Sequence, residues 1–440
     1  MSPKRFLILF TVLLIVIVPT SIILGGNPFG SVGSTVDGYP TFDSDMINVE
    51  QVAQTGKGVY VAVLDTGLAP NWKDYFPAER IATNLGTGFE QTVSFKAGND
   101  VCGLGVEIGA LRQSTYIGST GSTHGTHVTS TIIGYFYQSN VDAVSGFNLP
   151  PIIVRGIAPE ATIIPVKVLA DYQIPALPKC GSGIPASSAV FGTSEMVAAG
   201  IDYVAGLARA GYRPMVINMS LGAGASEPIS AVEKAAVDRA IAAGVVIVAA
   251  AGNDGDAGMD APGSYAPVIS AGSAGWTKQW IPNRMWWLQS DLLPFTDIGE
   301  PTPANEVYVS NFSGRTLSAD QDLDVLAPGA WVRGPFPGDP GYAHTPWWSN
   351  GQGNLHGINP GAFFYASGTS MASPHVAATA ALMLQKNPSL TAAQVEAKLE
   401  GTALPIGPGS ATVVRDGLQT WGANATGAGF IQADAAVAAS

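Results

Sequence analysis

The segment GTSMASPH places a serine, Ser370, where a hydroxyl could act as a nucleophile. The residues that follow have a helical pattern, with Gly368 before them to allow close backbone approach and Pro374 in the tolerated first turn. Unpaired amides at a helix N-terminus favour negative charge, which the tetrahedral intermediate of acyl transfer develops beside the serine oxygen. The octamer alone therefore predicts a serine nucleophile.

Two further segments hold the groups that such a serine needs. A hydroxyl has too high a pKa to attack a carbonyl unaided, whereas an imidazole can take and return its proton. A carboxylate can then hold the imidazole in one tautomer and stabilise its cation. Asp65 ends an apolar run in VAVLDTG, and His124 begins a helical pattern in HGTHVTSTIIG. We therefore expect Asp65, His124 and Ser370 to act together.

A fourth segment, VVIVAAAGNDG, delivers Asn253 into a turn after a second apolar run. An oxyanion needs hydrogen-bond donors fixed in place before the reaction. The side-chain amide of Asn253 and the backbone N–H of Ser370 are the two donors that the sequence predicts.

Other histidines have simpler interpretations. His127 and His375 lie within predicted helices and are expected to be structural. His344 and His356 lie in Gly- and Pro-rich loops and have no readable role. The DTG around Asp65 could, by itself, be only a turn. The prediction of an Asp–His–Ser triad therefore rests on the four segments together, because only the serine octamer is specific for such a site by itself.

The elements that position these residues alternate between strands and helices. Apolar runs predict strands at 59–65, 162–169, 215–220, 245–251, 268–272 and 324–327. Helices are predicted at 124–135, 194–210, 230–243, 369–385 and 392–400. This alternation predicts an α/β fold with a doubly wound, mainly parallel sheet flanked by helices. Such sheets build their sites at the carboxyl ends of the strands, where Asp65 and Asn253 lie.

The motifs DTG, HGTH, SLG, AAGN and GTSMASPH occur in the order found in subtilisin-like serine proteases, the subtilases, which the chain resembles from about Met46 to its C-terminus. The resemblance implies a serine endopeptidase that hydrolyses protein or peptide substrates and needs no cofactor for catalysis. Its triad would be Asp65, His124 and Ser370, with Asn253 in the oxyanion hole. The alternative is a non-catalytic extracellular binding protein that uses Trp-rich inserts on the same fold.

The resemblance also implies a substrate site in which an extended peptide pairs with a strand edge. Its primary pocket would be lined by Ser220, Leu221, Gly222, Ala250, Ala251 and Gly252. The loop 254–262 beside it is shorter than is usual in the family and carries Asp254, Asp256 and Asp260. A pocket-facing Asp260 would favour a basic residue before the scissile bond, and the alternative is a solvent-exposed side chain.

The start of the chain predicts an extracytoplasmic protein. Lys4 and Arg5 precede an uncharged apolar run over residues 6–24, which suits either a cleaved signal peptide or an N-terminal membrane anchor within 1–26. Residues 27–45 read as a linker, and 46–440 as the catalytic domain. The chain contacts a membrane through 6–24 only if this leader is retained.

Composition agrees with a secreted or surface enzyme. Apolar residues make up 46% of the chain, which excludes intrinsic disorder, and the net charge of −12 with only 12% charged residues argues against a nucleic-acid binder. Outside the cell, Cys102 and Cys180 could form a disulfide, and the sequence leaves this open.

Insertions relative to the family are expected near 86–120, 276–306 and 330–362. The last two hold seven tryptophans, which could form an aromatic rim or pack the loops internally: Trp276, Trp280, Trp286, Trp287, Trp331, Trp347 and Trp348. Asp74 matches a calcium-ligand position of the family, although the partner loop 135–146 is altered. The resemblance therefore allows a structural calcium ion without requiring one.

Overall fold

The computed structural model describes residues 34–97, 104–119, 123–137, 140–141, 148–149, 151–174, 187–225, 227–280, 286–289, 297–337, 349–350 and 363–440. Residues 6–24, both cysteines, His344, His356, Trp347 and Trp348 lie outside these ranges. The predictions made for them are therefore untested by the structure.

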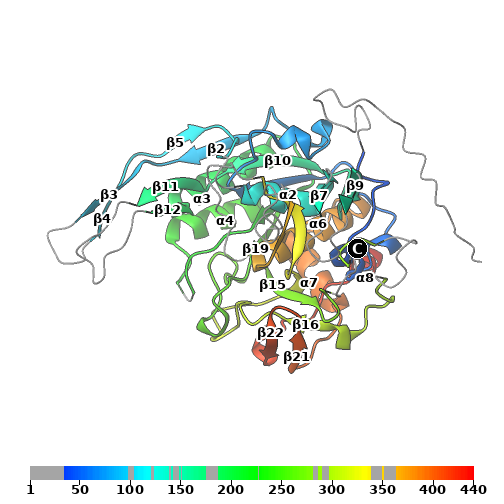
Figure 1. Cartoon of the computed structure of the whole chain (residues 1–440). Helices are drawn as coiled ribbons and strands as arrows, with labels where there is room; N and C mark the ends of the chain where they lie inside the picture. Colours follow the sequence, from blue (N-terminus) through cyan, green and yellow to red (C-terminus); the bar gives the residue numbers. More distant parts are fainter. Residues whose placement is uncertain are drawn as a thin grey trace, which may run out of the picture.

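A nine-stranded sheet forms the centre of the fold (Figure 1). Its strands are β1 (Tyr60–Asp65), β2 (Thr87–Glu90), β5 (Arg112–Ser114), β10 (Thr162–Lys167), β13 (Met215–Met219), β14 (Val245–Ala250), β15 (Ile269–Trp276), β16 (Val307–Val309) and β17 (Val325–Pro328). Their order is β16–β15–β14–β13–β1–β10–β2–β5, with β17 also paired to β15. Every pair is parallel except those of β16 and β5.

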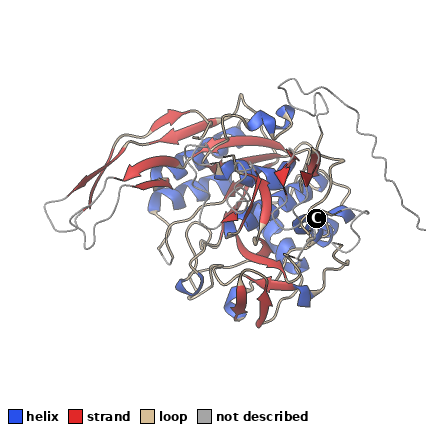
Figure 2. Cartoon of the chain, viewed as in Figure 1, coloured by secondary structure: helices blue, strands red, loops and turns tan. Residues whose placement is uncertain are grey.

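Helices cover both faces of this sheet (Figure 2). They are α1 (Phe42–Asp45), α2 (His124–Ile133), α3 (Ser194–Arg209), α4 (Ala231–Ala242), α6 (Thr369–Lys386), α7 (Ala392–Thr402) and α8 (Ala433–Ala439). Short 3₁₀ turns are η1 (Val49–Gln51), η2 (Trp72–Asp74), η3 (Ala78–Arg80), η4 (Gly255–Ala257), η5 (Ala304–Glu306) and η6 (Ala423–Ala425).

The central strands are apolar throughout because helices pack on both faces of the sheet. In β1, Val61 and Val63 join the core formed with α2, α6, α7 and α8, whereas Ala62 and Leu64 join the core formed with α3 and α4. Since successive side chains point to opposite faces, a strand covered on both sides must be apolar throughout. The prediction of a mainly parallel sheet flanked by helices is confirmed.

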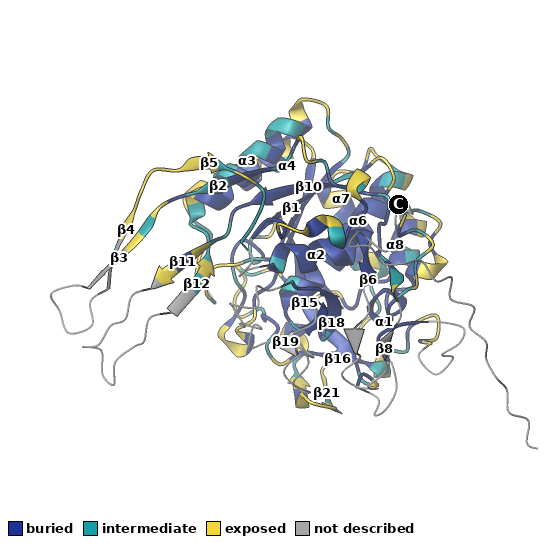
Figure 3. Ribbon diagram, turned by 45° about the horizontal axis from the view of Figure 1, so that its top comes forward, coloured by how far each residue is buried: buried dark blue, intermediate teal, exposed yellow. Residues whose placement is uncertain are grey.

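Shorter antiparallel strands surround the central sheet. They are β3 (Val93–Ala97), β4 (Leu104–Ile108), β6 (Gly134–Tyr137), β7 (Asn140–Val141), β8 (Asn148–Leu149), β9 (Ile152–Arg155), β11 (Ala170–Ile174), β12 (Ser187–Phe191), β18 (Val332–Pro335), β19 (Ser349–Asn350), β20 (Phe363–Ala366), β21 (Gly409–Val413) and β22 (Gly417–Trp421). The β3–β4 and β11–β12 pairs reach outward from the body of the molecule (Figure 3).

The predicted helices and strands are all present, with ends that differ by a few residues. The helix expected over 124–135 ends at Ile133 because Gly134 has a φ of 76°, and β6 begins there. Residues 42–45, placed in a linker by the sequence, form α1, and Phe42 is fully buried. The ordered fold therefore starts earlier than Met46. The division into domains is otherwise still a prediction.

The described tryptophans of the inserts pack inside the molecule. Trp276, Trp280, Trp286 and Trp287 are buried, and Trp331 is partly buried. The guanidinium of Arg333 lies 4.6 Å from the Trp287 ring centroid. These residues form core contacts, so within the described part of the chain they supply no exposed aromatic rim. For these five tryptophans the structure therefore favours internal packing over the binding surface that the alternative requires, and Trp347 and Trp348 lie outside the described residues.

Candidate active site

Three neighbouring parallel strands bring site residues to one edge of the sheet. Asp65 is the last residue of β1, Ser220 follows β13, and Asn253 follows β14. The helices α2 and α6, which pack on each other, start at the same edge with His124 and Ser370. Segments far apart in sequence therefore meet where open α/β sheets bind their ligands.

Asp65 and His124 form a close pair. The Nδ1 atom of His124 lies 2.9 Å from both Oδ1 and Oδ2 of Asp65. The Asp65 side chain is fully buried, and that of His124 is 15% exposed. Thr66 N donates to Asp65 Oδ1 at 2.7 Å. A carboxylate at this position favours an N–H on Nδ1 of His124 and holds the imidazole ring in one orientation.

A glycine lets α2 approach β1 closely enough for this pair. A Cβ on Gly125 would lie 2.5 Å from Gly67 O and 3.1 Å from Asp65 Cβ, which no larger residue could tolerate. The backbone N of Gly125 instead donates to Thr66 Oγ1 at 2.9 Å. In the HGTH motif, His124 is thus followed directly by Gly125, the residue that lets α2 bring the imidazole close to Asp65.

Ser370 is the second residue of α6 and is partly exposed. Its Oγ donates to Ser220 O at 3.2 Å. Pro374 lies in the second turn of α6, and not in the first turn as expected from the sequence. Proline has no N–H, so it leaves the carbonyl four residues earlier without its helical donor. That carbonyl belongs to Ser370, and Ser220 Oγ donates to it at 2.7 Å.

Asn253 has its amide orientation set by the residue before the serine. Its Oδ1 accepts hydrogen bonds from Thr369 N at 2.8 Å and from Thr369 Oγ1 at 3.0 Å. A Cβ built on Gly368 would lie 3.6 Å from Ser370 N and 3.8 Å from Asn253 Nδ2. The two donors expected from the sequence therefore border the same small space beside Gly368.

A buried polar network behind Ser370 was missed by the sequence analysis. Ser373 Oγ donates to Asn218 Oδ1 at 2.7 Å, and Asn218 Nδ2 donates to Ser220 Oγ at 3.1 Å. The network links β13 to α6. Asn218 interrupts an otherwise apolar strand, and this polar residue in a buried run was the available signal.

The other described histidines are structural, as expected. His127 is fully buried with Nε2 3.2 Å from Val332 O, and burial, with the nearby His124, lowers its pKa to about 4. His375 is also buried, between Met371 O at 2.7 Å and Asp43 Oδ2 at 3.0 Å.

The predicted substrate segments lie next to this site. Ser220, Leu221 and Gly222 leave the carboxyl end of β13, and Ala250, Ala251 and Gly252 leave that of the adjacent β14. Asp260 lies between the two segments: a Cβ on Gly222 would be 2.6 Å from Asp260 Cβ, and one on Gly252 would be 2.5 Å from Asp260 Cγ. The side chain is therefore not the freely exposed one that the alternative required.

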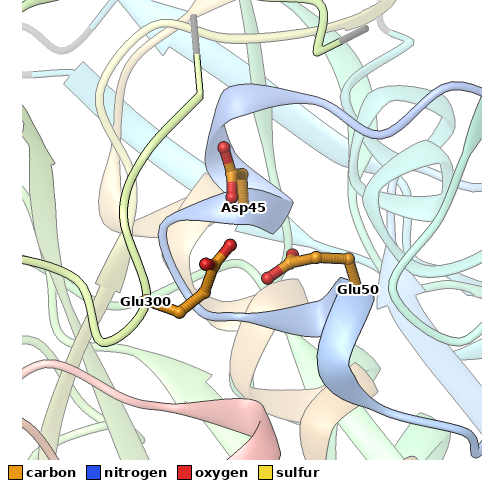
Figure 4. A group of neighbouring side chains, drawn as sticks. All are labelled: Asp45, Glu50 and Glu300. Carbon is orange, nitrogen blue, oxygen red and sulfur yellow. The ribbon is translucent and has the colours of Figure 1, made fainter. Parts of the chain in front are cut away.

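Two groups of acidic residues in the described part of the chain could hold a metal ion: Asp45, Glu50 and Glu300, and Asp322, Asp324 and Glu396. Figure 4 shows the first group, in which three carboxyl groups converge. Burial, followed by neighbouring carboxylates, raises the pKa of Asp45 to about 8 and that of Glu50 to about 7. Asp74 belongs to neither group and accepts a hydrogen bond from Asn71 at 3.2 Å.

Comparison with known proteins agrees with this fold. The model of the subtilase family (Peptidase S8) matches residues 56–429. Subtilisin E of Bacillus subtilis is 30% identical over 291 residues, 65% of this chain and 52% of that protein. Subtilisin DY of Bacillus licheniformis is 28% identical over 376 residues, 84% of this chain and 92% of that protein. The solved structure of sphericase matches 90% of this chain and 99% of its own, with a TM-score of 0.54 and 24% identity, which supports the fold.

The matched family model and the solved structure of sphericase define a subtilisin-like fold. The chain belongs to the subtilase family. The alignment spans about half of subtilisin E but nearly all of subtilisin DY. The activity, residue roles, substrates, partners and location of the whole protein are therefore proposals. Among the described residues, no helix has the length and apolar character needed to span a membrane.

Proposed function

We propose that this chain hydrolyses peptide bonds in protein substrates through an acyl-enzyme on Ser370, with His124 as the base and Asp65 as its partner. The observation that carries the proposal is the 2.9 Å contact of His124 Nδ1 with both oxygens of the fully buried Asp65. This contact supports a triad role because it leaves Nε2 free of its proton and ready to accept one.

In the first half of the reaction, His124 Nε2 takes the proton of Ser370 Oγ while Oγ bonds to the substrate carbonyl carbon. The C–N bond then breaks, and the imidazolium returns the proton to the leaving amine. In the second half, water replaces the amine and the same steps release the acid. The buried Asp65 carboxylate stabilises the imidazolium in both halves.

Asn253 Nδ2 and Ser370 N are proposed to stabilise the oxyanion. Thr369 supports this role, because its two hydrogen bonds to Asn253 Oδ1 hold the amide before substrate binds. Removing the same donor in subtilisin costs about 100- to 1,000-fold in kcat, and we expect Asn253→Ala to fall in that range here.

The peptide substrate is proposed to lie extended against 220–222 and 250–252. Main-chain hydrogen bonds would supply affinity, and the pocket between the segments would read one side chain. This binding mode predicts cleavage of unfolded or exposed segments. No nucleic acid is proposed as a partner, and the net charge of −12 agrees with that.

Covalent labelling tests the proposal. A fluorophosphonate should label the folded protein, and Ser370→Ala should abolish the label. Ser410→Ala, an exposed serine on β21, is the matched control and should label normally. An unlabelled wild type with an intact thermal transition would contradict the proposed reaction.

The location and the cation remain proposals as well. An extracytoplasmic enzyme, either secreted or anchored at the outer face of the membrane, agrees with the leader expected over 6–24. Sequencing the N-terminus of the mature protein would test whether this leader is removed. Calcium would need oxygen ligands, which Asp45, Glu50 and Glu300 could supply. If calcium binds, a chelator should lower the melting temperature.

A further inference from the structure

The loop 254–262 is hydrogen-bonded to both substrate segments. Asp260 N donates to Ala251 O at 2.9 Å, and Ala223 N donates to Ala261 O at 2.8 Å. These bonds fix the backbone of Asp260 between the strand ends that would form the two pocket walls. They therefore fix the point from which the Asp260 side chain leaves the main chain.

The Asp260 carboxyl group occupies the slot between the walls. The positions of Gly222 and Gly252 leave no room for added side chains, because a Cβ there would lie 2.9 Å and 2.8 Å, respectively, from Asp260 Oδ2. The φ of Gly252 is 100°, which other residues rarely adopt. Two glycines thus border the space in which a substrate side chain would meet Asp260.

No group among the described residues neutralises this carboxyl. Asp260 Oδ1 is buried and has no hydrogen-bond partner in that part of the chain. The other acids of the loop do have partners: Asp254 Oδ2 accepts from Ala225 N at 3.1 Å, and Asp256 pairs with Arg315. Burial, and then the charge of Asp254, raises the pKa of Asp260 to about 7. A partly buried acid without a counter-charge carries a desolvation cost that a cationic ligand would offset.

We propose that Asp260 is a specificity-determining residue that selects substrates with lysine or arginine immediately before the scissile bond. The inference rests on the proposed function, because it assigns a ligand to the pocket of that site. A cationic side chain entering between Gly222 and Gly252 would bring the missing partner to Asp260. The other two acids are engaged with protein groups and do not provide this selection.

The experiment compares kcat/KM for peptide substrates that differ only at that residue: Arg, Lys, Leu, Phe and Ala. Wild type should prefer Arg and Lys. Asp260→Asn should lower kcat/KM for Arg by at least about 30-fold, since losing one partner of a buried charge pair costs about 2 kcal/mol or more. The value for Leu should change by less than about threefold, because a neutral side chain gains nothing from the charge.

Asp256→Asn is the matched control, since it makes the same charge change in the same loop at a side chain that is 87% exposed. It should retain the Arg preference. Fluorophosphonate labelling of Ser370 reports whether each variant folds, and Asp260→Ser is a second variant if the first does not label. A wild-type preference for Leu, Phe or Ala, or equal Arg-to-Leu ratios in wild type and Asp260→Asn, would overturn this inference alone. Absence of both cleavage and labelling in wild type would overturn the proposed function too.

Discussion

Two carboxyl groups, that of the fully buried Asp65 and that of the partly buried Asp260, have different environments at the residue scale. Asp65 faces His124 Nδ1 and accepts a backbone N–H, whereas Asp260 has a buried oxygen with no partner among the described residues. The first is suited to holding an imidazole in place, and the second to receiving a cation from outside. Each environment leads to its own test.

Asp65→Asn should retain the fold but lower kcat by about 10⁴-fold, as expected when the imidazole partner loses its charge and the tautomer changes. The measurement is kcat on any cleaved peptide at pH 7 to 8, with thermal melting as the check on folding. A loss of less than tenfold in a well-folded variant would remove Asp65 from the mechanism.

The preference assigned to Asp260 should depend on pH. Its pKa of about 7 means that the carboxyl is largely neutral at pH 6 and charged at pH 8. The facing segments 220–222 and 250–252 carry no titratable side chain, and Asp254 is the nearby charge. The ratio of kcat/KM for Arg over Leu should therefore rise from pH 6 to pH 8 in wild type. It should be flat in Asp260→Asn, and a parallel rise in that variant would assign the effect elsewhere.

The sequence was enough to propose the reacting residues, but it did not indicate the residues that hold them in place. Asp65, His124, Asn253 and Ser370 each lie in a short local motif, so residue types and order were enough to propose them. Whether Asp260 faces the pocket depends on how 254–262 bonds to two separate strand ends, and no pattern within the loop encodes that.

At the scale of elements, Ser220, which follows β13, supplies a hydrogen bond that α6 lacks because of Pro374. Pro374 leaves the Ser370 carbonyl without its usual donor, and Ser220 Oγ supplies one at 2.7 Å. This bond joins α6 to the end of β13, and thus the proposed nucleophile to the proposed substrate segment. By itself, Pro374 would only weaken α6. The carbonyl that it leaves without a helical donor is the one through which β13 and α6 are linked.

Ser220→Ala should destabilise the protein by about 1 kcal/mol because it leaves the partly buried Ser370 carbonyl without its donor. Adding Pro374→Ala should restore part of this loss, since the alanine introduced there has an N–H that can donate to the Ser370 carbonyl within the helix. Chemical denaturation of the wild type, both single variants and the double variant gives the coupling energy. Additive effects would show that the two sites do not share this carbonyl.

Elements that are covered on both faces were predictable, and the peripheral hairpins were not. β1, β13 and β14 carry continuous apolar runs because helices cover both sides of them. The β3–β4 and β11–β12 pairs lie at the surface, and Ile108 and Val190 are 54% and 42% exposed. Without a buried face, such strands lack the alternation by which a sequence reveals them.

At the scale of the whole molecule, several buried carboxyls have raised pKa values. Burial raises the pKa of Asp45 and of Asp324 to about 8, against about 3.9 in an unfolded chain. Between these values the folded protein binds more protons than the unfolded one, so its stability falls as pH rises. The neighbours of Asp45 are also acids, namely Glu50, Asp297 and Glu300, and they oppose its ionisation.

The melting temperature should therefore decrease from pH 5 to pH 8 when metal ions are removed with EDTA. Asp45→Asn should make this slope shallower, because asparagine can still accept the hydrogen bond from Ile298 N without titrating. Asp320→Asn changes the same charge at an exposed position and is the control. A melting temperature that rises over this range in wild type would contradict the assignment.

The proposed nucleophile lies on α6, which packs against β13, β14, β15 and α2. Asp65 and His124 precede Ser370 by more than two hundred residues in the sequence, so a ribosome adds them long before the serine. A partly synthesised polypeptide therefore lacks both the proposed nucleophile and the helix that covers the central strands β13, β14 and β15. The proposed proteolytic activity would thus appear only after α6 has been synthesised.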